Sequence, residues 1–396
     1  MLEKLWKCLL IVSASFFVCT ADAVTQKPWT FLVYMAAAND LHQLALLDIE
    51  KMMQAGSNEH VNVLVYLTIQ EDNQPKTTVK LYVEKGSVQQ IGDTMIRDSG
   101  DVATLEEALR WACREYPSDH SAIVLWSHGS GALNRSKGVC YDFDTEHYLT
   151  DCNCLQAFSW ACDSVRDGKK FDIIAFNAPF LGSIEIAYAL SACADYMVAS
   201  EGTLPDDGYE YAYILDQLAM QMFDPISFAQ LMVNASQGKY VEMSDYMVSA
   251  IDLNALQPFV DNCNAIVQIL TTQLLGTEKA DARAVLKKCV TENCLSFDQG
   301  IYIDMCQFYK NVLKYSNGLK LSKSVVNEFK QLLNDGIRLF SDIIKAYVAS
   351  PNYAKAGGLS IYFSRHFLDP SYYGLYWSQR NPHWLNFLEA FLDSNL

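Results

Sequence analysis

The chain has 396 residues, of which 51% are hydrophobic, 19% charged and 12% aromatic. This composition excludes an intrinsically disordered chain. It also excludes a polytopic membrane protein, because no apolar run past the N-terminus approaches the ~20 residues that span a bilayer. The formal net charge of -16 repels phosphate backbones, so we expect no nucleic-acid partner and expect cationic groups to be attracted instead.

Residues 1–23 have the pattern of a cleavable signal peptide. Lys4 and Lys7 supply a basic start, Leu9 to Val18 form a short apolar core, and Ala21-Asp22-Ala23 gives the small-x-small cleavage site. The core is too short to span a membrane, although an anchor or a short buried helix is the alternative. We therefore predict an exported protein, periplasmic, cell-surface or secreted, with no membrane span after signal cleavage.

The cysteines fit an exported protein and indicate no metal site. Of 12 cysteines, Cys8 and Cys19 lie in the leader, so ten remain in the mature chain. An even number permits disulfides in an oxidising compartment, but their pairing cannot be read from the sequence. Because no spacing matches a zinc site, we predict no metal.

The first half of the mature chain alternates strands with helices. Apolar or alternating runs predict strands at 30–37, 61–69, 77–85, 121–126, 171–176 and 196–200, and helical periodicity predicts helices at 41–55, 104–116, 154–165 and 183–192. Asn39 and Asp40 are predicted to cap the first of these helices, and Asp101 is predicted to open the second. The alternation predicts a parallel sheet covered by helices on both faces.

After Glu201 the pattern becomes mainly helical. We predict helices at 208–220, 227–236, 253–275, 325–347 and 384–392, with one late strand at 358–363. No linker rich in Gly, Ser or Pro interrupts the chain. We therefore predict a single α/β domain over 24–396, with a helical C-terminal elaboration.

Two loops at the carboxyl ends of buried strands are the best candidates for a functional site. The strand at 121–126 runs into Ser127-His128-Gly129-Ser130-Gly131, and the strand at 171–176 runs into 177–182, Asn-Ala-Pro-Phe-Leu-Gly. We expect these loops to face each other across a narrow gap. A His beside glycines suits a general base next to an oxyanion hole, although a surface His in a Gly-rich turn is the alternative.

Several segments, in order, resemble those of the clostripain-like cysteine peptidases. They are WTFLVYMAAANDL, LWSHGSG, FDIIAFNAPFLGSIEIAYAL, VASEGTLPDDGYEYAYIL, SDYMVSAIDLNAL and AGGLSIYF. The resemblance extends from about residue 29 to residue 392. It implies a caspase-like fold, a three-layer α/β/α sandwich with a mostly parallel sheet.

The resemblance also implies a catalytic His/Cys dyad, with His128 as the histidine and the Gly129 N–H as an oxyanion donor. Family members read Asp-Ala-Cys-Leu-Met-Gly where this chain has residues 177–182. Pro179 therefore stands at the nucleophile position, and Asn177 replaces an acidic residue of the pocket that binds Arg or Lys. Proline has neither a nucleophilic atom nor an N–H. We predict a catalytically inactive pseudo-peptidase that binds a peptide or protein.

Two alternatives come from other functional classes. The first is an active cysteine peptidase that cleaves after Arg or Lys through a relocated nucleophile, and the second is a purely structural envelope or surface protein. The residues that could in principle serve as that nucleophile are Cys140, Cys152, Cys154 and Cys193. We expect these thiols to be buried or disulfide-bonded, and Ser127 and Ser130 flank the His too closely to share its substrate.

Three further expectations follow from the resemblance. Glu201 matches a family glutamate beside the cleft and is assigned to substrate binding together with Asn177, although capping a helix would explain it equally well. The acidic turn with Asp142, Asp144 and Glu146 could bind the calcium that some relatives use, but we expect solvated surface and assign no cofactor. Relatives mature by cleavage in a loop that corresponds to 134–138, and we expect this chain to stay in one piece.

Overall fold

The computed structural model describes residues 26–71, 73–133, 138–237 and 245–393. The predicted signal peptide, at 1–23, lies outside the described residues, as does most of the 134–138 segment. Within the described residues, no helix combines the length and the hydropathy needed to cross a membrane.

A nine-stranded sheet, counted over the described residues, forms the centre of the molecule in the order β11-β8-β7-β6-β5-β1-β2-β3-β4. Its parallel core consists of β1 (Lys27–Ala37), β2 (Val61–Ile69), β5 (Ser118–Trp126), β6 (Phe171–Asn177) and β7 (Ala194–Ala199). Antiparallel strands complete both edges: β3 (Thr77–Glu84) and β4 (Ser87–Met95) on one side, β8 (Met247–Asp252) and β11 (Ile344–Ala349) on the other.

The parallel strands are apolar because both of their faces are covered. In β1, Phe31 and Val33 belong to one buried cluster, whereas Leu32 and Tyr34 belong to another on the opposite face. Alternating side chains of a strand point to opposite faces, so each face of the sheet has a core of its own. All of β2 is buried for the same reason.

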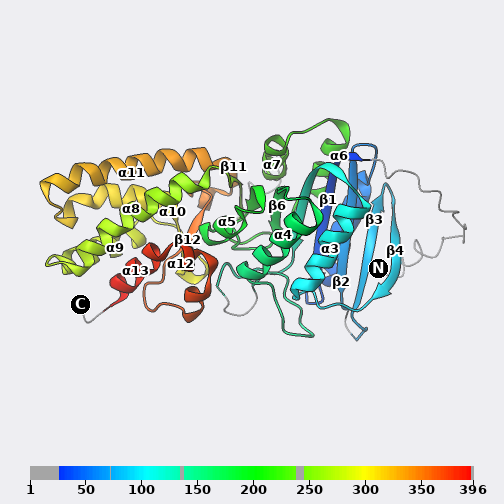
Figure 1. Cartoon of the computed structure of the whole chain (residues 1–396), viewed down its shortest axis with the longest axis horizontal. Coiled ribbons are helices and arrows are strands. Elements are labelled where there is room, and N and C mark those ends of the chain that lie inside the picture. The colour runs from blue at the N-terminus through cyan, green and yellow to red at the C-terminus, as the bar shows by residue number, and fades with distance from the viewer. Residues whose placement is uncertain (1–25, 72, 134–137, 238–244, 394–396) are drawn as a thin grey trace, which may run out of the picture.

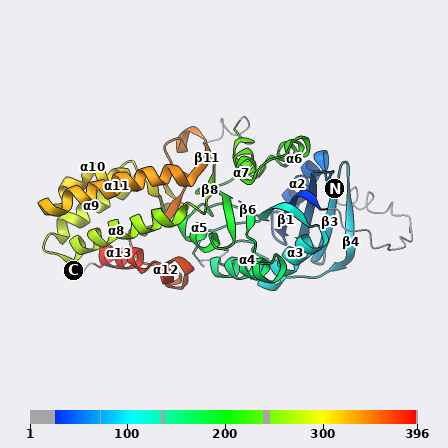
Figure 2. The same cartoon turned by 45° about the horizontal axis from the view of Figure 1, so that its top comes forward.

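Six helices, within the described part of the chain, form the two outer layers (Figure 2). One face carries α3 (Val102–Glu115), α4 (Asp151–Val165) and α5 (Ile184–Leu190), and the other carries α2 (His42–Ala55), α6 (Tyr211–Met220) and α7 (Pro225–Asn234). Asp101 caps α3 as predicted, since its side chain accepts the N–H of Ala103. The predicted α/β/α sandwich with a mostly parallel sheet is confirmed.

The C-terminal third of the chain extends from one end of this sandwich (Figure 1). Its helices are α8 (Leu256–Leu275), α9 (Lys279–Thr291), α10 (Met305–Tyr315), α11 (Lys323–Ile343), α12 (Tyr376–Arg380) and α13 (Pro382–Leu392). Short helical turns are η1 (Asp298–Gly300), η2 (Ser316–Leu319), η3 (Pro351–Tyr353) and η4 (Pro370–Gly374). A small antiparallel sheet contains β9 (Ser296–Phe297), β10 (Tyr302–Asp304) and β12 (Ser360–Tyr362), the last at the predicted late strand.

The prediction of helices and one late strand after Glu201 missed four strands, β8, β9, β10 and β11. Residues 344–347, predicted as the end of a helix, belong to β11, which pairs antiparallel with the unpredicted strand β8. Helix α11 ends where the chain turns extended at Ile344. Pairing with the open edge of the sheet, a contact distant in sequence, overrides the local helical pattern there.

A buried carboxyl joins the sandwich to its C-terminal extension. Glu185, in the first turn of α5, is fully buried, and its Oε1 accepts hydrogen bonds from the Tyr362 N–H at 2.9 Å and the Tyr372 hydroxyl at 3.2 Å. Burial raises the pKa of Glu185 to about 7, because the charged form loses its hydration. The folded chain therefore holds this proton more tightly than the unfolded chain does.

We predict that loss of the Glu185 proton lowers the free energy of unfolding as the pH rises. Its folded pKa of about 7 exceeds the unfolded value near 4.3, so its contribution is present below about pH 4 and is lost by about pH 7, a change of roughly 3 kcal/mol. Glu185→Gln keeps an acceptor for Tyr362 and removes the titration. Urea unfolding at about pH 5 and pH 8 should show a flatter profile for Glu185→Gln than for the parent chain. Glu328→Gln, at an exposed position, is the control and should show the same pH dependence as the parent chain. An equal change in the free energy of unfolding between the two pH values in all three proteins would refute the role given to Glu185.

Candidate functional site

Three neighbouring parallel strands, β1, β5 and β6, end level with one another at the carboxyl end of the sheet. Met35 of β1 lies opposite Trp126 of β5, and Trp126 lies opposite Asn177 of β6. The N–H of Ser127 then bonds to the Asn177 carbonyl at 3.3 Å, so the chains separate only after this point. The loops that follow these strands are thereby brought to the same place, which is where parallel sheets carry their sites.

His128 is held by two neighbours. Its Nε2 lies 2.5 Å from the Asp40 Oδ1, and its ring is nearly parallel to that of Phe143, with an interplanar angle of 7° and centroids 6.1 Å apart. The His128 side chain is 23% exposed, so it remains open to solvent. A carboxylate in this position fixes the orientation of the imidazole.

Asp40 is a site residue that the sequence analysis missed. It was predicted to cap the helix, but α2 has Leu41 at its N-cap without a side-chain hydrogen bond, and Asn39 accepts the N–H of Leu41. Asp40 instead reaches across to His128. Its position directly after β1, at the carboxyl edge of the sheet, was the signal that could have identified it.

Gly129 packs directly against the 177–182 turn. A Cβ on Gly129 would collide with the Pro179 carbonyl oxygen and lie 2.9 Å from the Leu181 Cδ2. A side chain is therefore excluded at this position, and the two loops lie in contact. The structure thus brings His128, Gly129 and Pro179 together.

The turn that carries Pro179 is strained. Phe180 has φ of 65°, in the left-handed region, where a bulky residue costs of order 1–2 kcal/mol. The loop after β7 holds this conformation, because the Phe180 N–H donates to the Gly202 carbonyl at 2.9 Å and the Gly182 N–H donates to the Ser200 carbonyl at 2.7 Å. Residue 179 is thereby fixed at the apex of a sharp turn beside His128.

A pocket of about 180 Å³ opens between these loops. Its lining residues are Leu41, Leu44, Trp126, Ser127, His128, Asn177, Ala178, Pro179, Leu204, Pro205, Asp206 and Gly208. Asn177 is 8% exposed, and its Nδ2 donates to the Tyr211 hydroxyl at 3.1 Å. The pocket therefore combines His128, Pro179 and a neutral amide, with several apolar side chains.

A buried carboxyl lies behind the Trp126 wall of this pocket. Asp48 accepts the Trp126 indole N–H at 2.8 Å and the Lys51 ammonium at 2.7 Å, and Lys51 also donates to the Asp207 carbonyl. Burial raises the pKa of Asp48 to about 6, against the opposing effect of Lys51. The charge of this carboxyl is balanced within the protein.

A second, more open pocket lies on the Asp40 side of His128. It measures about 320 Å³ and is lined by Ala38, Asn39, Asp40, His42, Gln70, Glu71, Asn73 and Phe143. Because Asp40 contacts His128, the two pockets meet at this pair. An extended ligand that crosses His128 would reach both.

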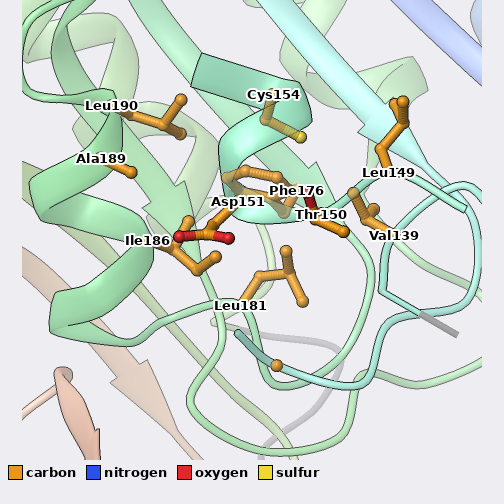
Figure 3. Close-up of a pocket in the computed structure, with 11 residues that line it drawn as sticks. Val139, Leu149, Thr150, Asp151, Cys154, Phe176, Leu181, Ile186, Ala189 and Leu190 are labelled. Carbon is orange, nitrogen blue, oxygen red and sulfur yellow. The ribbon is translucent and has the colours of Figure 1, made fainter. Parts of the chain in front are cut away.

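A third cavity lies behind the turn, between α4, α5 and β6 (Figure 3). Phe176, Leu181 and Ile186 point toward it, and its volume is about 10 Å³. Such a space holds one water molecule at most, so it is a packing defect and not a ligand site.

The structure does not bring Glu201 to the pocket. Its side chain is 1% exposed, its Oε2 accepts the Gly358 N–H at 2.9 Å, and it lies against Asp304. Burial and the Asp304 carboxyl raise the pKa of Glu201 well above its usual range. Glu201 leaves the end of β7 toward the small C-terminal sheet, where it joins the two parts of the molecule.

The acidic turn after the His128 loop holds a lysine. The Lys76 ammonium lies 3.1 Å from carboxylate oxygens of both Asp142 and Asp144, and Ser99 donates to the buried Asp142. Glu146 is exposed. An ammonium between two carboxylates does not fit the six to eight oxygen ligands of calcium. Among the described residues, no group of three or more His, Cys, Asp or Glu side chains is placed to hold a metal ion.

The cysteines predicted as possible replacement nucleophiles do not line the pocket. Burial raises the pKa of the Cys140 and Cys154 thiols, which disfavours the thiolate. Cys152 is exposed and not disulfide-bonded, so the expectation that it is buried or bonded was wrong, but partial desolvation and the adjacent Asp151 raise its pKa as well. Ser127 does line the pocket, but its hydroxyl donates to the Ala36 carbonyl at 3.0 Å.

The pKa of Cys193 is lowered, chiefly by its interaction with the Cys162 side chain and also by the Ser159 hydroxyl, which lies 3.2 Å from its sulfur. Cys193 lies near the amino-terminal end of β6, whereas the pocket lies at the carboxyl end of that strand. Its carbonyl accepts the N–H of Phe171, the first residue of β6, whereas the pocket begins at Asn177, the last residue of that strand. Six strand residues separate these points by about 20 Å, too far for Cys193 to work with His128.

The chain matches the Clostripain family over residues 33–384. It belongs to the Clostripain family. Clostripain from Hathewaya histolytica is 21% identical to it, over 90% of this chain and 78% of that protein.

Among solved structures of this kind, an inactive zymogen C11 protease from Parabacteroides distasonis is 20% identical with a TM-score of 0.66, over 90% of this chain and 99% of that one. A secreted C11 cysteine protease from Bacteroides thetaiotaomicron, in complex with an irreversible peptide inhibitor, is 21% identical with a TM-score of 0.63, over 91% and 99%. At these identities the similarity to the clostripain-family structures shows a shared fold.

We predict that Gly129→Ala separates the two loops of the clostripain-family site. The added Cβ has no space between Pro179 and Leu181, so we expect a loss of about 1–3 kcal/mol in the free energy of unfolding. Gly374→Ala is the matched control, because its Cβ would meet no atom within 4 Å, and it should change stability by less than about 0.5 kcal/mol. Equal effects of both changes on urea unfolding would contradict the packing described here.

Proposed function

We propose that this clostripain-family chain is an exported pseudo-peptidase that binds a peptide or protein segment between His128 and Pro179 without cleaving it. The observation that carries the proposal is a proline at the apex of the turn facing His128. Export is supported by the leader-like sequence at 1–23 and by a secreted relative from Bacteroides thetaiotaomicron.

Proline removes two functions from the same position. Covalent peptide cleavage by a cysteine peptidase needs a thiolate, and the proline ring offers no nucleophilic atom. The tetrahedral intermediate also needs backbone donors, and proline has no N–H, which leaves that of Gly129. Loss of a single oxyanion donor lowers the rate by about 10²–10³. Both losses oppose turnover.

The parts that would bind a peptide are retained. The pockets on the two sides of the His128–Asp40 pair offer space for successive side chains of an extended segment. The strained Phe180 turn still holds residue 179 beside His128, although no nucleophile exploits that geometry. The relative from Bacteroides thetaiotaomicron was solved with a peptide inhibitor bound, which supports peptide binding in this fold.

The test of inactivity uses Pro179→Cys. We expect the purified parent chain to cleave a fluorogenic peptide panel no faster than background. Pro179→Cys restores both a thiol and an N–H at the apex, so its rate should exceed that of the parent by at least about 100-fold. Adding His128→Ala to that variant should abolish the gain.

Pro205→Cys is the matched control, because it places a thiol on the same pocket but away from the strained turn. The Pro205→Cys variant should cleave the peptide panel no faster than the parent chain does. Turnover by the parent chain that disappears in His128→Ala would overturn the proposal and indicate an active peptidase with another nucleophile.

Binding is tested on the parent chain itself. Peptides that bind should slow hydrogen exchange in segments 127–131 and 177–182, while β3 and β4 at the far edge of the sheet serve as the internal control. Absence of protection over a range of peptide sequences, with the protein folded, would exclude the binding function.

A further inference from the structure

We infer that the pocket between His128 and Pro179 selects an uncharged, apolar side chain of the bound peptide and discriminates against Arg and Lys. This inference rests on the proposed peptide binding and assigns the chemistry of one subsite. It follows from the walls, the base and the charge balance of the pocket.

Apolar side chains from three parts of the fold line this pocket, beside the polar Ser127 and His128. Helix α2 and the residue before it contribute Leu44 and Leu41, the end of β5 contributes Trp126, and the loop after β7 contributes Leu204 and Pro205. The volume of about 180 Å³ is slightly larger than a cavity of about 150 Å³ that accepts benzene. A leucine, methionine or phenylalanine side chain therefore fits this space and gains by leaving water.

The base of the pocket carries no formal charge. Asn177 donates to the Tyr211 hydroxyl at 3.1 Å, and Gly208 packs so closely on it that a Cβ there would lie 2.5 Å from the Asn177 Nδ2. An amide fixed in this way offers a cation a dipole but not a counter-ion. A buried guanidinium or ammonium would lose its hydration without gaining a charged partner.

The buried carboxyl behind the wall does not supply that partner. Asp48 already binds the Trp126 indole N–H and the Lys51 ammonium, and Lys51 is fixed further by the Asp207 carbonyl. The protein thus provides its own cation to the acid behind the pocket. An incoming Lys or Arg would have to displace Lys51 from this carboxyl.

The remaining acid of the lining is at the rim. Asp206 is exposed, and an ion pair with an exposed carboxylate contributes little because water and salt screen it. His128, paired with Asp40, adds no negative charge to the pocket. The selectivity is therefore set by the apolar walls and the neutral base.

The experiment measures binding of labelled alanine peptides that differ at one central residue, namely Leu, Met, Phe, Lys or Arg, by fluorescence polarisation at about 0.15 M salt. The parent chain should bind the Leu, Met or Phe peptide at least about 10-fold more tightly than the Lys and Arg peptides. Asn177→Asp should narrow or reverse this preference by giving the base a charge.

Leu204→Asp, on a loop, is a second variant that should shift the preference in the same direction if Asn177→Asp fails to fold. Asp93→Asn, on the distant strand β4, is the control and should leave the ranking unchanged. Asp206→Asn should weaken binding of the Lys peptide by no more than about fivefold.

The outcomes separate the two proposals. If no peptide of the panel binds the folded parent chain, peptide binding itself fails. If peptides bind but Lys or Arg is preferred, the cleft is functional and the inference about its subsite is wrong. Equal affinities for charged and apolar peptides would likewise overturn it.

Discussion

The matched ends of β1, β5 and β6 determine the rest of the site. Because the three strands run parallel and Met35, Trp126 and Asn177 lie in one row, the residues after them must emerge side by side. Asp40 and His128 lie in the loops that follow β1 and β5 and form a pair. The third strand leads into the turn with Pro179, which contacts Gly129. A shift of one residue in either register would move a whole loop away from its partners and turn its side chains to the other face.

The sequence predicted the parts of the fold that depend on local patterns. Buried parallel strands such as 121–126 are recognisable because both faces are apolar, and Asp101 marks the start of α3 through its capping side chain. Strands β8 and β11 were missed, because each is stabilised by pairing with a neighbour distant in sequence. The pattern of 325–347 gives no sign of where the helix stops and the pairing begins.

The site was predicted in part for the same reason. His128 and the 177–182 turn stand out because each follows a buried strand, and the structure brings them into contact. Asp40 was assigned to a helix cap, since a capping residue and a His partner look alike in sequence. Glu201 was assigned to the cleft, but the direction of its side chain depends on the small C-terminal sheet, which local sequence does not reveal. Nor does the sequence reveal that Lys51 neutralises Asp48 behind the pocket wall.

The pairing of Lys76 with the acidic turn at Asp142 and Asp144 bears on the ionic surroundings in which the cleft keeps its shape. A metal ion between carboxylates is bound in proportion to its concentration in the surroundings, and a chelator can remove it. The Lys76 ammonium is covalently part of the chain, so its local concentration near Asp142 and Asp144 is fixed by the fold. The turn that positions Phe143 against His128 is thereby supported by a cation that belongs to the chain. The same cleft geometry should persist in calcium-rich and calcium-poor surroundings alike.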